Sequence, residues 1–318
     1  MAMSLEEFLE EWNNSSPYIH VQTSGSTGVP KPMLVEKRRM LNSARITCDF
    51  LGLHEGDTAL LCMSLDYIAG KMMVVRAVER GLKLIVQEPN GHPMAVSSID
   101  FAAMVPMQVY NSLQVPEERE RLMQIKNLII GGGAIDDALA AELKTFPNAV
   151  WSTYGMTETL SHIALRRLSG PEASEFYTPF PGVRLSLSPE DCLIIDAPEV
   201  CPEPLVTNDI AELSFQNFKI LGRKDNIICS GGLKIQAEQL ERQLRPHIRV
   251  PYLISKRPDA KFGEIVVLLT EGSVDEAREV CQRVLPKYHQ PRAYIHLDHI
   301  PLTETGKPAR KQAELEIR

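Results

Sequence analysis

The strongest constraint on the fold is an alternation of short apolar runs with longer amphipathic stretches over residues 18–155. The apolar runs have the length of buried strands, and the amphipathic stretches carry apolar residues at helical spacing. Strands that alternate with helices predict a mostly parallel sheet with helices on its faces, and such sheets bind ligands beyond the carboxyl ends of their strands. The predicted strands are Tyr18–Gln22, Ala59–Cys62, Leu82–Val86, Ala102–Val105, Leu128–Ile130 and Val150–Tyr154, and the predicted helices are Glu36–Phe50, Ile68–Arg80 and Asp137–Phe146.

The pattern changes near residue 163. Residues 163–222 contain short strands joined by turns with Pro and Asp, which predicts a small β-subdomain. Beyond residue 225 the pattern predicts a separate α+β unit. We therefore expect an α/β fold with a large N-terminal domain, residues 1–224, and a small C-terminal domain, residues 225–318. The C-terminal helices are predicted at 237–244 and 274–285, and the strands at 252–255, 265–269 and 293–297.

The composition argues against several classes of protein. The 318 residues carry a net charge of −7, whereas a general nucleic-acid binder has a basic surplus. The six cysteines show no Cys-x-x-Cys spacing, which argues against a zinc ribbon or a redox dithiol. No apolar run reaches the ~18 residues of a membrane span, and the acidic N-terminus lacks the apolar region of a signal peptide. We expect a cytoplasmic protein that binds no nucleic acid. The sequence leaves open whether the chain forms a homo-oligomer.

The stretch TSGSTGVPK, residues 23–31, follows the first predicted strand. Its glycines let backbone N–H groups turn inward, its hydroxyls add donors and its lysine adds a charge, which together suit phosphate oxygens. It does not end in the Gly-Lys-Ser/Thr of a Walker loop. The composition alone is more typical of a plain Gly/Ser turn, and the position after a strand makes phosphate binding an equal alternative. The residues concerned are Thr23, Ser24, Gly25, Ser26, Thr27, Gly28 and Lys31.

A second stretch, TYGMTET, covers residues 153–159 at the end of another predicted strand. Tyr154 offers a flat face for a base, Thr157 offers a hydroxyl, and Glu158 offers a carboxylate for Mg²⁺, which proteins hold by hard oxygen ligands and substrate phosphates. The alternative interpretation is a strand end followed by a helix that Thr157 caps.

Four other segments carry weaker signals. The glycines of NLIIGGGAI, residues 127–135, allow a flat ligand to approach the backbone closely, or form a tight turn. Asp209 ends a predicted strand and could accept hydrogen bonds from ribose hydroxyls, and Arg223 could bind a phosphate or ribose. Lys307 lies in PLTETGKPARK, residues 301–311, which alone is typical of a surface turn.

The order of these segments is more specific than any one of them. TSGSTGVPK, GGGAI, TYGMTET, TND, GRKDNIICSGG and PLTETGKPAR stand in the sequence order of the adenylate-forming enzymes. From residue 18 onward the chain resembles this superfamily of acyl- and aryl-CoA ligases. The resemblance implies attack of a carboxylate on the α-phosphate of ATP, followed by displacement of AMP by a thiol such as that of coenzyme A.

The resemblance also implies a role for each matching residue. Residues 23–28 and Lys31 are expected to wrap the β- and γ-phosphates, Thr157 to touch the α-phosphate, and Glu158 to hold Mg²⁺. Lys307 is expected to bridge the carboxylate and the α-phosphate in the first half-reaction only, after which the C-terminal domain swings about a hinge at Asp225. Gly132, Gly133, Ala134 and Tyr154 are expected to line the adenine, and Asp209 and Arg223 to bind the ribose. Gly155 and Met156 are also expected to bind the nucleotide, and Gly231 and Gly232 to line the thiol channel.

The acid is inferred from residues 64–81, 101–113 and 153–165, which look most like the o-succinylbenzoate–CoA ligases of menaquinone biosynthesis. That acid has two carboxylates, so the one that is not activated needs a cation, and a bidentate guanidinium suits it. Arg76 falls where those ligases carry a substrate-binding arginine; the alternative is a solvated or salt-bridged helix residue. Lys71 is a weaker candidate, and Tyr67 and His162 complete the expected acid pocket.

Two departures from the family leave alternatives open. The stretch DYIAG, which contains Ala69, stands where these ligases often have a His and a Ser. Another aryl or acyl acid, or a carrier-protein thiol as the acceptor, therefore stays open. Relatives also usually carry a long subdomain before the phosphate loop, so the surface it covers is expected to be smaller, exposed or buried in an oligomer. A non-catalytic nucleotide-binding protein is the third alternative, although it would need neither Lys307 nor Glu158.

Overall fold

The computed structural model describes residues 3–22, 32–133, 135–303 and 308–317. They form two compact units. Unit 1 comprises Met1–Leu185, Ile195–Leu205 and Leu213–Phe218, and unit 2 comprises Ser186–Ile194, Val206–Glu212 and Lys219–Arg318. The boundary predicted between residues 224 and 225 falls inside unit 2, and motion about Asp225 stays a prediction.

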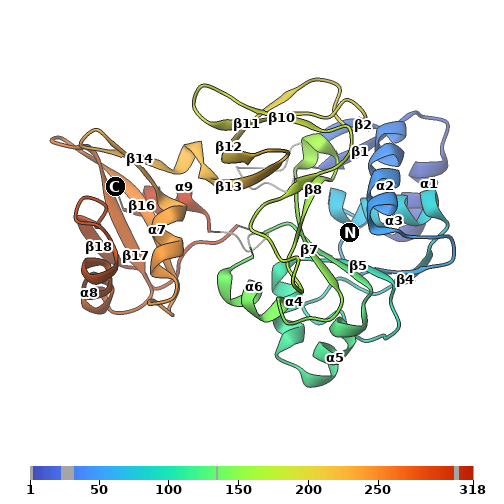
Figure 1. The fold of residues 1–318 in the computed structure, drawn as a ribbon, viewed down its shortest axis with the longest axis horizontal. Helices are drawn as coiled ribbons and strands as arrows, with labels where there is room; N and C mark the ends of the chain where they lie inside the picture. Colours follow the sequence, from blue (N-terminus) through green and yellow to red (C-terminus); the bar gives the residue numbers. More distant parts are fainter. Residues whose placement is uncertain (1–2, 23–31, 134, 304–307, 318) are drawn as a thin grey trace. The chain divides into compact units, whose positions relative to one another are not determined.

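A seven-stranded sheet organises unit 1 (Figure 1). Its first five strands are parallel, as the alternating pattern predicts, and β8 and β9 extend it in antiparallel fashion. The α/β fold class is therefore confirmed. In spatial order the strands are β4 (Lys83–Val86), β3 (Thr58–Leu61), β5 (Phe101–Met104), β6 (Asn127–Ile130), β7 (Ala149–Gly155), β8 (His162–Arg167) and β9 (Thr178–Pro179).

Helices cover this sheet because alternate strand residues point to opposite faces. On one face Leu60, Met104, Ile130 and Val150 join one apolar cluster with side chains of α4, α5 and α6. Helix α3 packs on β3 and β4, and α2 packs on α3. The helices of unit 1 are α1 (Leu5–Asn13), α2 (Lys37–Leu51), α3 (Ile68–Arg80), α4 (Pro106–Leu113), α5 (Pro116–Gln124) and α6 (Asp137–Leu143), with a 3₁₀ turn η1 at Thr157–Thr159.

Two predicted strands belong to other sheets than expected. The first strand, β1 (Tyr18–Gln22), does not join the parallel sheet; it pairs antiparallel with β2 (Pro32–Glu36), so that Gln22 lies opposite Pro32. The pairing places the two ends that flank residues 23–31 side by side. Conversely, residues 163–168 were expected in the β-subdomain, but β8 pairs with β7 in the large sheet. The subdomain itself is a four-stranded sheet in the order β10 (Arg184–Leu187), β11 (Cys192–Asp196), β12 (Leu205–Ser214) and β13 (Asn217–Arg223).

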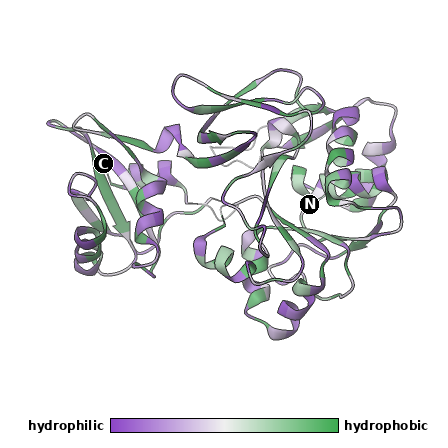
Figure 2. Ribbon diagram, viewed as in Figure 1, coloured by the Kyte–Doolittle hydropathy of each residue, from purple (hydrophilic) through white to green (hydrophobic). Residues whose placement is uncertain are grey.

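Unit 2 contains a five-stranded sheet with apolar clusters on both faces. Val266 and Leu268 of β17 pack toward α7 and α8, while Val267 and Leu269 pack toward α9. Figure 2 shows the hydrophobic colouring of this central strand. The elements are β14 (Ile227–Ser230), β15 (Leu233–Gln236), β16 (Tyr252–Asp259), β17 (Gly263–Thr270), β18 (Ala293–His296), α7 (Ala237–Leu244), α8 (Val274–Val284), α9 (Arg310–Glu316) and the 3₁₀ turn η2 (Lys224–Asn226).

Candidate active site

The turn that follows β7 folds the chain back on itself within a few residues. A Cβ atom on Gly155 would lie 2.2 Å from the carbonyl oxygen of Ser161 and 2.4 Å from Cα of His162, so only glycine fits. The Thr159 hydroxyl accepts a hydrogen bond from the Met156 amide at 3.1 Å and holds the turn closed. Strand β8 then starts at His162, antiparallel to β7. The turn therefore presents residues 156–159 at the carboxyl end of β7, where such a sheet binds ligands.

Thr157 and Glu158 differ in exposure within this turn. Thr157 is buried and begins the 3₁₀ turn η1, whereas Glu158 is exposed. Among the residues described, no cationic or hydrogen-bonding partner occupies the Glu158 carboxylate. An exposed carboxylate without a partner fits Mg²⁺, which takes one or two protein carboxylates and completes its shell with water and substrate phosphates. The described residues hold no group of three or more His, Cys, Asp or Glu that would bind a metal without such a substrate.

The glycine segment lies beside this turn. Strand β6 pairs in parallel with β7, and Gly131 follows β6 directly. A Cβ atom on Gly131 would lie 2.3 Å from the Thr153 hydroxyl oxygen, so the glycine backbone packs against β7. Gly132 and Gly133 follow at the same edge of the sheet as Tyr154, while Ala134 lies outside the described residues. The sheet thus brings two of the segments expected at the adenine to neighbouring strand ends.

Two aromatic residues that the sequence analysis missed surround Tyr154. The Tyr154 ring lies 5.0 Å from that of Phe218 and 5.7 Å from that of Tyr177, measured between centroids, and the Tyr177 and Phe218 rings stack on each other. The Tyr177 hydroxyl also lies 2.9 Å from that of Ser152. These contacts fix the tyrosine expected to line the adenine. No local pattern marks Tyr177 or Phe218, because they reach Tyr154 from distant segments.

Arg76 is the least expected charge in unit 1. It lies on α3 and is 2% exposed, and burial lowers its pKa to about 10. Its Nη2 donates a hydrogen bond to the Ser161 hydroxyl at 2.7 Å, and its Nε–H has no partner. Among the described residues no carboxylate pairs with it, so the alternative of a solvated or salt-bridged helix residue is wrong for this part of the chain. A buried cation without an anion is costly, which is the property expected of a site that waits for an anionic ligand.

His162 contacts the same hydroxyl. Its Nδ1 lies 3.2 Å from Ser161 Oγ, and its Nε2 lies 3.1 Å from the hydroxyl of Thr47 on α2. Burial, and then the nearby Arg76 charge, lower the pKa of His162 well below its ordinary value, so the ring is neutral at pH 7.

Lys71 and Tyr67 occupy the other end of α3. Lys71 is buried and its ammonium donates to the carbonyl oxygen of His20 at 2.8 Å, above the ring of Phe8. Burial lowers its pKa. The Lys71 ammonium therefore already has a protein acceptor, whereas Arg76 keeps a buried Nε–H without one. Tyr67 is half-buried and is the residue that precedes α3.

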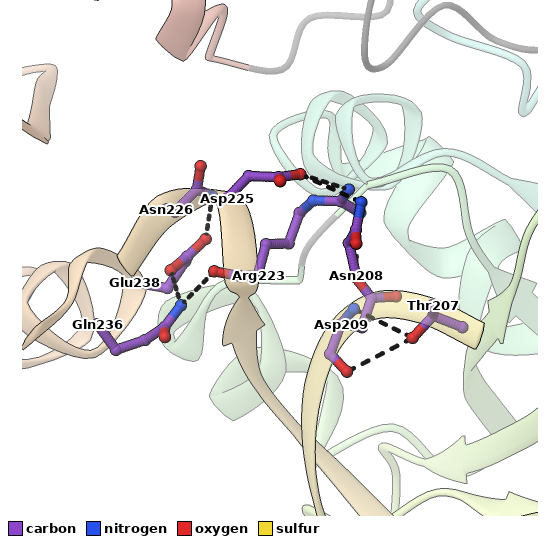
Figure 3. Close-up of polar contacts among 8 residues, drawn as sticks. All are labelled: Thr207, Asn208, Asp209, Arg223, Asp225, Asn226, Gln236 and Glu238. Carbon is purple, nitrogen blue, oxygen red and sulfur yellow. Dashed lines mark hydrogen bonds and ion pairs between the residues drawn. The ribbon is translucent and has the colours of Figure 1, made fainter. Parts of the chain in front are cut away.

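In unit 2 the predicted ribose residues meet the predicted hinge residue (Figure 3). Arg223 donates to Asp209 at 3.0 Å through Nη1 and to Asp225 at 3.2 Å through Nη2. The Arg223 backbone oxygen accepts from Gln236 at 3.0 Å, and Glu238 accepts from Asn226. One guanidinium thus links Asp209 to residue 225. The sequence predicted Asp209 at a strand end, but it lies in the middle of β12, because the strand continues to Ser214. Because the Arg223 side chain is 38% exposed, solvent screens this pair and its contribution to stability is small.

The predicted thiol-channel glycines form the turn between β14 and β15. Gly231 and Gly232 both adopt positive φ, at 58° and 85°. The Gly231 amide donates to the carbonyl oxygen of Phe262 at 2.9 Å, so this turn is fixed to the sheet of unit 2. The phosphate-loop residues 23–31 and Lys307 lie outside the described residues, so their predicted roles stay predictions.

Comparisons with known proteins find relatives of this chain both by sequence and by fold. The family described as AMP-binding enzyme matches residues 6–194. The 2-succinylbenzoate–CoA ligase of Listeria monocytogenes serovar 1/2a is 24% identical over 343 aligned positions, which cover 96% of this chain and 71% of the relative. Within the described residues, no helix is long and apolar enough to cross a membrane.

Two solved structures are similar to the chain. An acyl-CoA synthetase (AMP-forming)/AMP-acid ligase II-like protein from Dyadobacter fermentans has 33% identity and a TM-score of 0.67, with 98% of this chain and 92% of the other covered. The o-succinylbenzoate coenzyme A synthetase from Bacillus subtilis, in complex with ATP and magnesium ion, has 22% identity and a TM-score of 0.78, with 92% of this chain and 69% of the other covered. The second similarity shows the fold alone.

Proposed function

Because the chain belongs to the family of AMP-binding enzymes, we propose that it is an ATP-dependent acid–CoA ligase whose acid is o-succinylbenzoate. The curated relatives that bear this name support the choice of acid, and a relative at 33% identity that is described as an AMP-forming synthetase supports the reaction class. We expect the enzyme to act in the cytoplasm.

The reaction has two steps. An oxygen of the succinyl carboxylate attacks the α-phosphorus of ATP, and the bond to pyrophosphate breaks, which gives an acyl-adenylate. The sulfur of coenzyme A then attacks the acyl carbon, and AMP leaves with the bonding electrons. The first step joins two anions, so its rate depends on positive charge and N–H donors placed where charge builds up.

Different residues of the site would supply this charge, donate these hydrogen bonds and bind the adenosine. Glu158 would hold Mg²⁺, which supplies positive charge to the phosphates when it is bound. Thr157 lies one residue before it and would donate to the α-phosphate. Residues 23–28, Lys31 and Lys307 would supply the remaining donors to the phosphates and the reacting carboxylate. The adenosine would lie on Tyr154 and the glycine segment, with its ribose hydroxyls at Asp209 and Arg223.

Arg76 is the observation that carries the choice of acid. o-Succinylbenzoate keeps its ring carboxylate throughout the reaction, so the pocket needs a cation that the chemistry does not use. Arg76 is a buried guanidinium that has a free Nε–H and no carboxylate partner among the described residues. It lies one hydrogen bond from Ser161, which in turn packs against Gly155 in the site turn. A carboxylate bound there would neutralise the buried charge.

ATP–pyrophosphate exchange tests the proposal. The wild-type protein with Mg²⁺ should exchange label with o-succinylbenzoate, and only weakly with 4-oxo-4-phenylbutanoate, which lacks the ring carboxylate. Exchange with benzoates but not with o-succinylbenzoate would replace the proposed acid. No exchange with any acid would favour a nucleotide-binding protein without catalysis, and transfer to a carrier protein rather than to coenzyme A would change the acceptor.

A further inference from the structure

A chain of hydrogen bonds runs from Thr47 on helix α2 through His162 and Ser161 to Arg76. The Thr47 hydroxyl lies 3.0 Å from the carbonyl oxygen of Ser43 and 3.1 Å from Nε2 of His162. Nδ1 of the same ring lies 3.2 Å from Ser161 Oγ, which accepts from Arg76 at 2.7 Å. Thr47 is fully buried, and His162 is 7% exposed. Water therefore has little access to Thr47 and His162, and their polar atoms depend on each other and on half-buried Ser161 for hydrogen bonds.

The hydrogen-bond direction follows from counting hydrogens. A carbonyl oxygen can only accept, so Thr47 donates its one hydrogen to Ser43 and accepts from His162 Nε2–H. The neutral ring then has its lone pair on Nδ1, and Ser161 donates to it. The Ser161 oxygen keeps a lone pair for Arg76 Nη2. The hydroxyl hydrogens of Thr47 and Ser161 and the ring N–H of His162 then all have acceptors.

The reverse direction satisfies fewer groups. If Thr47 donated to Nε2, the hydrogen of the ring would lie on Nδ1 and point at Ser161. Ser161 would then accept from both His162 and Arg76, and its own hydrogen would have no acceptor among the described residues. Ser161 is only half-buried, so the reverse direction leaves its hydroxyl hydrogen to solvent, whereas the first direction pairs that hydrogen within the protein and is the one we infer.

We propose that Thr47, His162 and Ser161 are positioning residues that form a one-directional hydrogen-bond relay and hold the Arg76 guanidinium for the second carboxylate of the acid. The relay consumes one hydrogen of Nη2. It leaves the second hydrogen of Nη2, the unpartnered Nε–H, and Nη1 with only a 3.8 Å contact to the Met73 sulfur. Nη2 can therefore still offer a carboxylate two parallel hydrogen bonds, together with either Nε or Nη1. Both ring nitrogens of His162 are occupied inside the protein, so His162 acts through Arg76 and does not bind the acid itself. The inference rests on the proposed role of Arg76.

The relay explains how a buried cation keeps a defined orientation without an ion pair. A guanidinium recognises a carboxylate by two parallel hydrogen bonds, so its plane must be fixed before the ligand arrives. Small displacements of a positioning group reduce rates strongly, because the bound geometry sets how far the reacting atoms have to move. Thr47 is fully buried on α2 and reaches Arg76 only through His162 and Ser161, which makes it a specific test.

The test compares Thr47→Val, which keeps the shape and loses the hydroxyl, with Thr47→Ser, which keeps the hydroxyl. Thr47→Val should raise KM for o-succinylbenzoate about tenfold, the effect of one lost buried hydrogen bond, with KM for ATP unchanged. Thr47→Ser should stay within about twofold of the wild type. With 4-oxo-4-phenylbutanoate as the acid, Thr47→Val should match the wild type. Equal KM values of Thr47→Val and wild type for o-succinylbenzoate would overturn the relay.

A measurement on the ring separates this inference from the proposed function, because it needs no acid. The ¹⁵N spectrum of the wild-type protein at pH 7 should show His162 as the neutral Nε2–H tautomer, and Thr47→Val should perturb that signal while Thr47→Ser keeps it. An Nδ1–H tautomer in the wild type would overturn the relay whichever acid the enzyme uses. Absence of acid-dependent exchange in the wild type would instead contradict the proposed function and leave the tautomer result standing.

Discussion

Arg76 and Arg310 are both largely removed from solvent, yet their surroundings are opposite. The Arg310 side chain is 17% exposed, donates to Glu241 at 2.6 Å and to the carbonyl oxygen of Ile254 at 2.6 Å, and so ties the start of α9 to α7 and β16. Burial opposes its charge, but Glu241 more than offsets this and raises its pKa. Arg76 is 2% exposed and has no carboxylate among the described residues, and burial lowers its pKa to about 10.

The contrast separates a structural cation from a binding cation. A buried ion pair that is complete within the protein has nothing left for a ligand, and breaking it exposes an uncompensated charge. A buried cation held only by a hydroxyl is costly in the free protein, and an anionic ligand recovers that cost on binding. Substitutions at different charged residues should therefore separate three effects: a lower rate of the chemical step, a lower free energy of unfolding, or weaker binding of the acid alone.

The largest effect is expected at Lys307. We assign a catalytic role to this C-terminal lysine, whereas nearby Arg310 has a structural role. Lys307→Ala should lower acid-dependent ATP–pyrophosphate exchange by about 10²–10³-fold, the usual loss when one preorganised donor to a developing charge is removed. Thioester formation from supplied acyl-adenylate and coenzyme A should stay largely intact. The exposed Lys311 offers a matched control, since Lys311→Ala should leave both steps near wild type. Equal loss of both steps in Lys307→Ala would contradict a role confined to adenylation.

Next in size is the loss of stability at Arg310. Arg310→Met leaves Glu241 buried without its cation and should lower the free energy of unfolding by about 3–5 kcal/mol in urea titrations. Adding Glu241→Leu should restore most of that loss, because an apolar pair can replace a buried ion pair. Arg76→Met removes a cation that has no carboxylate partner and should cost far less. Similar losses at Arg76 and Arg310 would mean that the two arginines do not differ as described.

A smaller effect is expected at Asp100, a carboxylate whose partners lie within the protein. Burial alone would raise the pKa of Asp100, but Lys126 and the amide and hydroxyl of Thr58 lower it to about 2. A lowered carboxylate pKa adds stability above the unfolded value, near 3.9, that disappears as the pH falls toward 2. Asp100→Asn should therefore cost about 1–2 kcal/mol at pH 7 and little at pH 2 in denaturant titrations, since exposed Lys126 contributes weakly. A cost that does not depend on pH would contradict this origin.

The sequence predicted the helix that carries Arg76 better than it predicted the environment of that arginine. The predicted bounds of α3, Ile68–Arg80, are confirmed, because helical spacing and the glycine at residue 81 mark the helix locally. Burial of Arg76 depends on α2 and β8, which the helix meets only after folding. The same reason applies to Tyr177 and Phe218 around Tyr154.

Strand order shows a similar limit. The apolar run at residues 18–22 was correctly predicted as a strand, but its partner β2 is short, begins with Pro32 and gives little local signal. The parallel sheet was predictable because its strands alternate with helices. The antiparallel addition of β8 was not, since it depends on the tight turn at Gly155, where the chain reverses against Ser161.

The pairing of Arg76 with the ring carboxylate is tested most directly by a cycle of two enzymes and two acids. The value of kcat/KM should be measured for wild type and Arg76→Met, each with o-succinylbenzoate and with 4-oxo-4-phenylbutanoate. We predict that Arg76→Met lowers kcat/KM for o-succinylbenzoate about 100-fold, the effect of removing a charged partner from a buried pair, and leaves KM for ATP unchanged. We also predict that it hardly changes kcat/KM for the acid without the ring carboxylate. An equal loss with both acids would contradict the pairing.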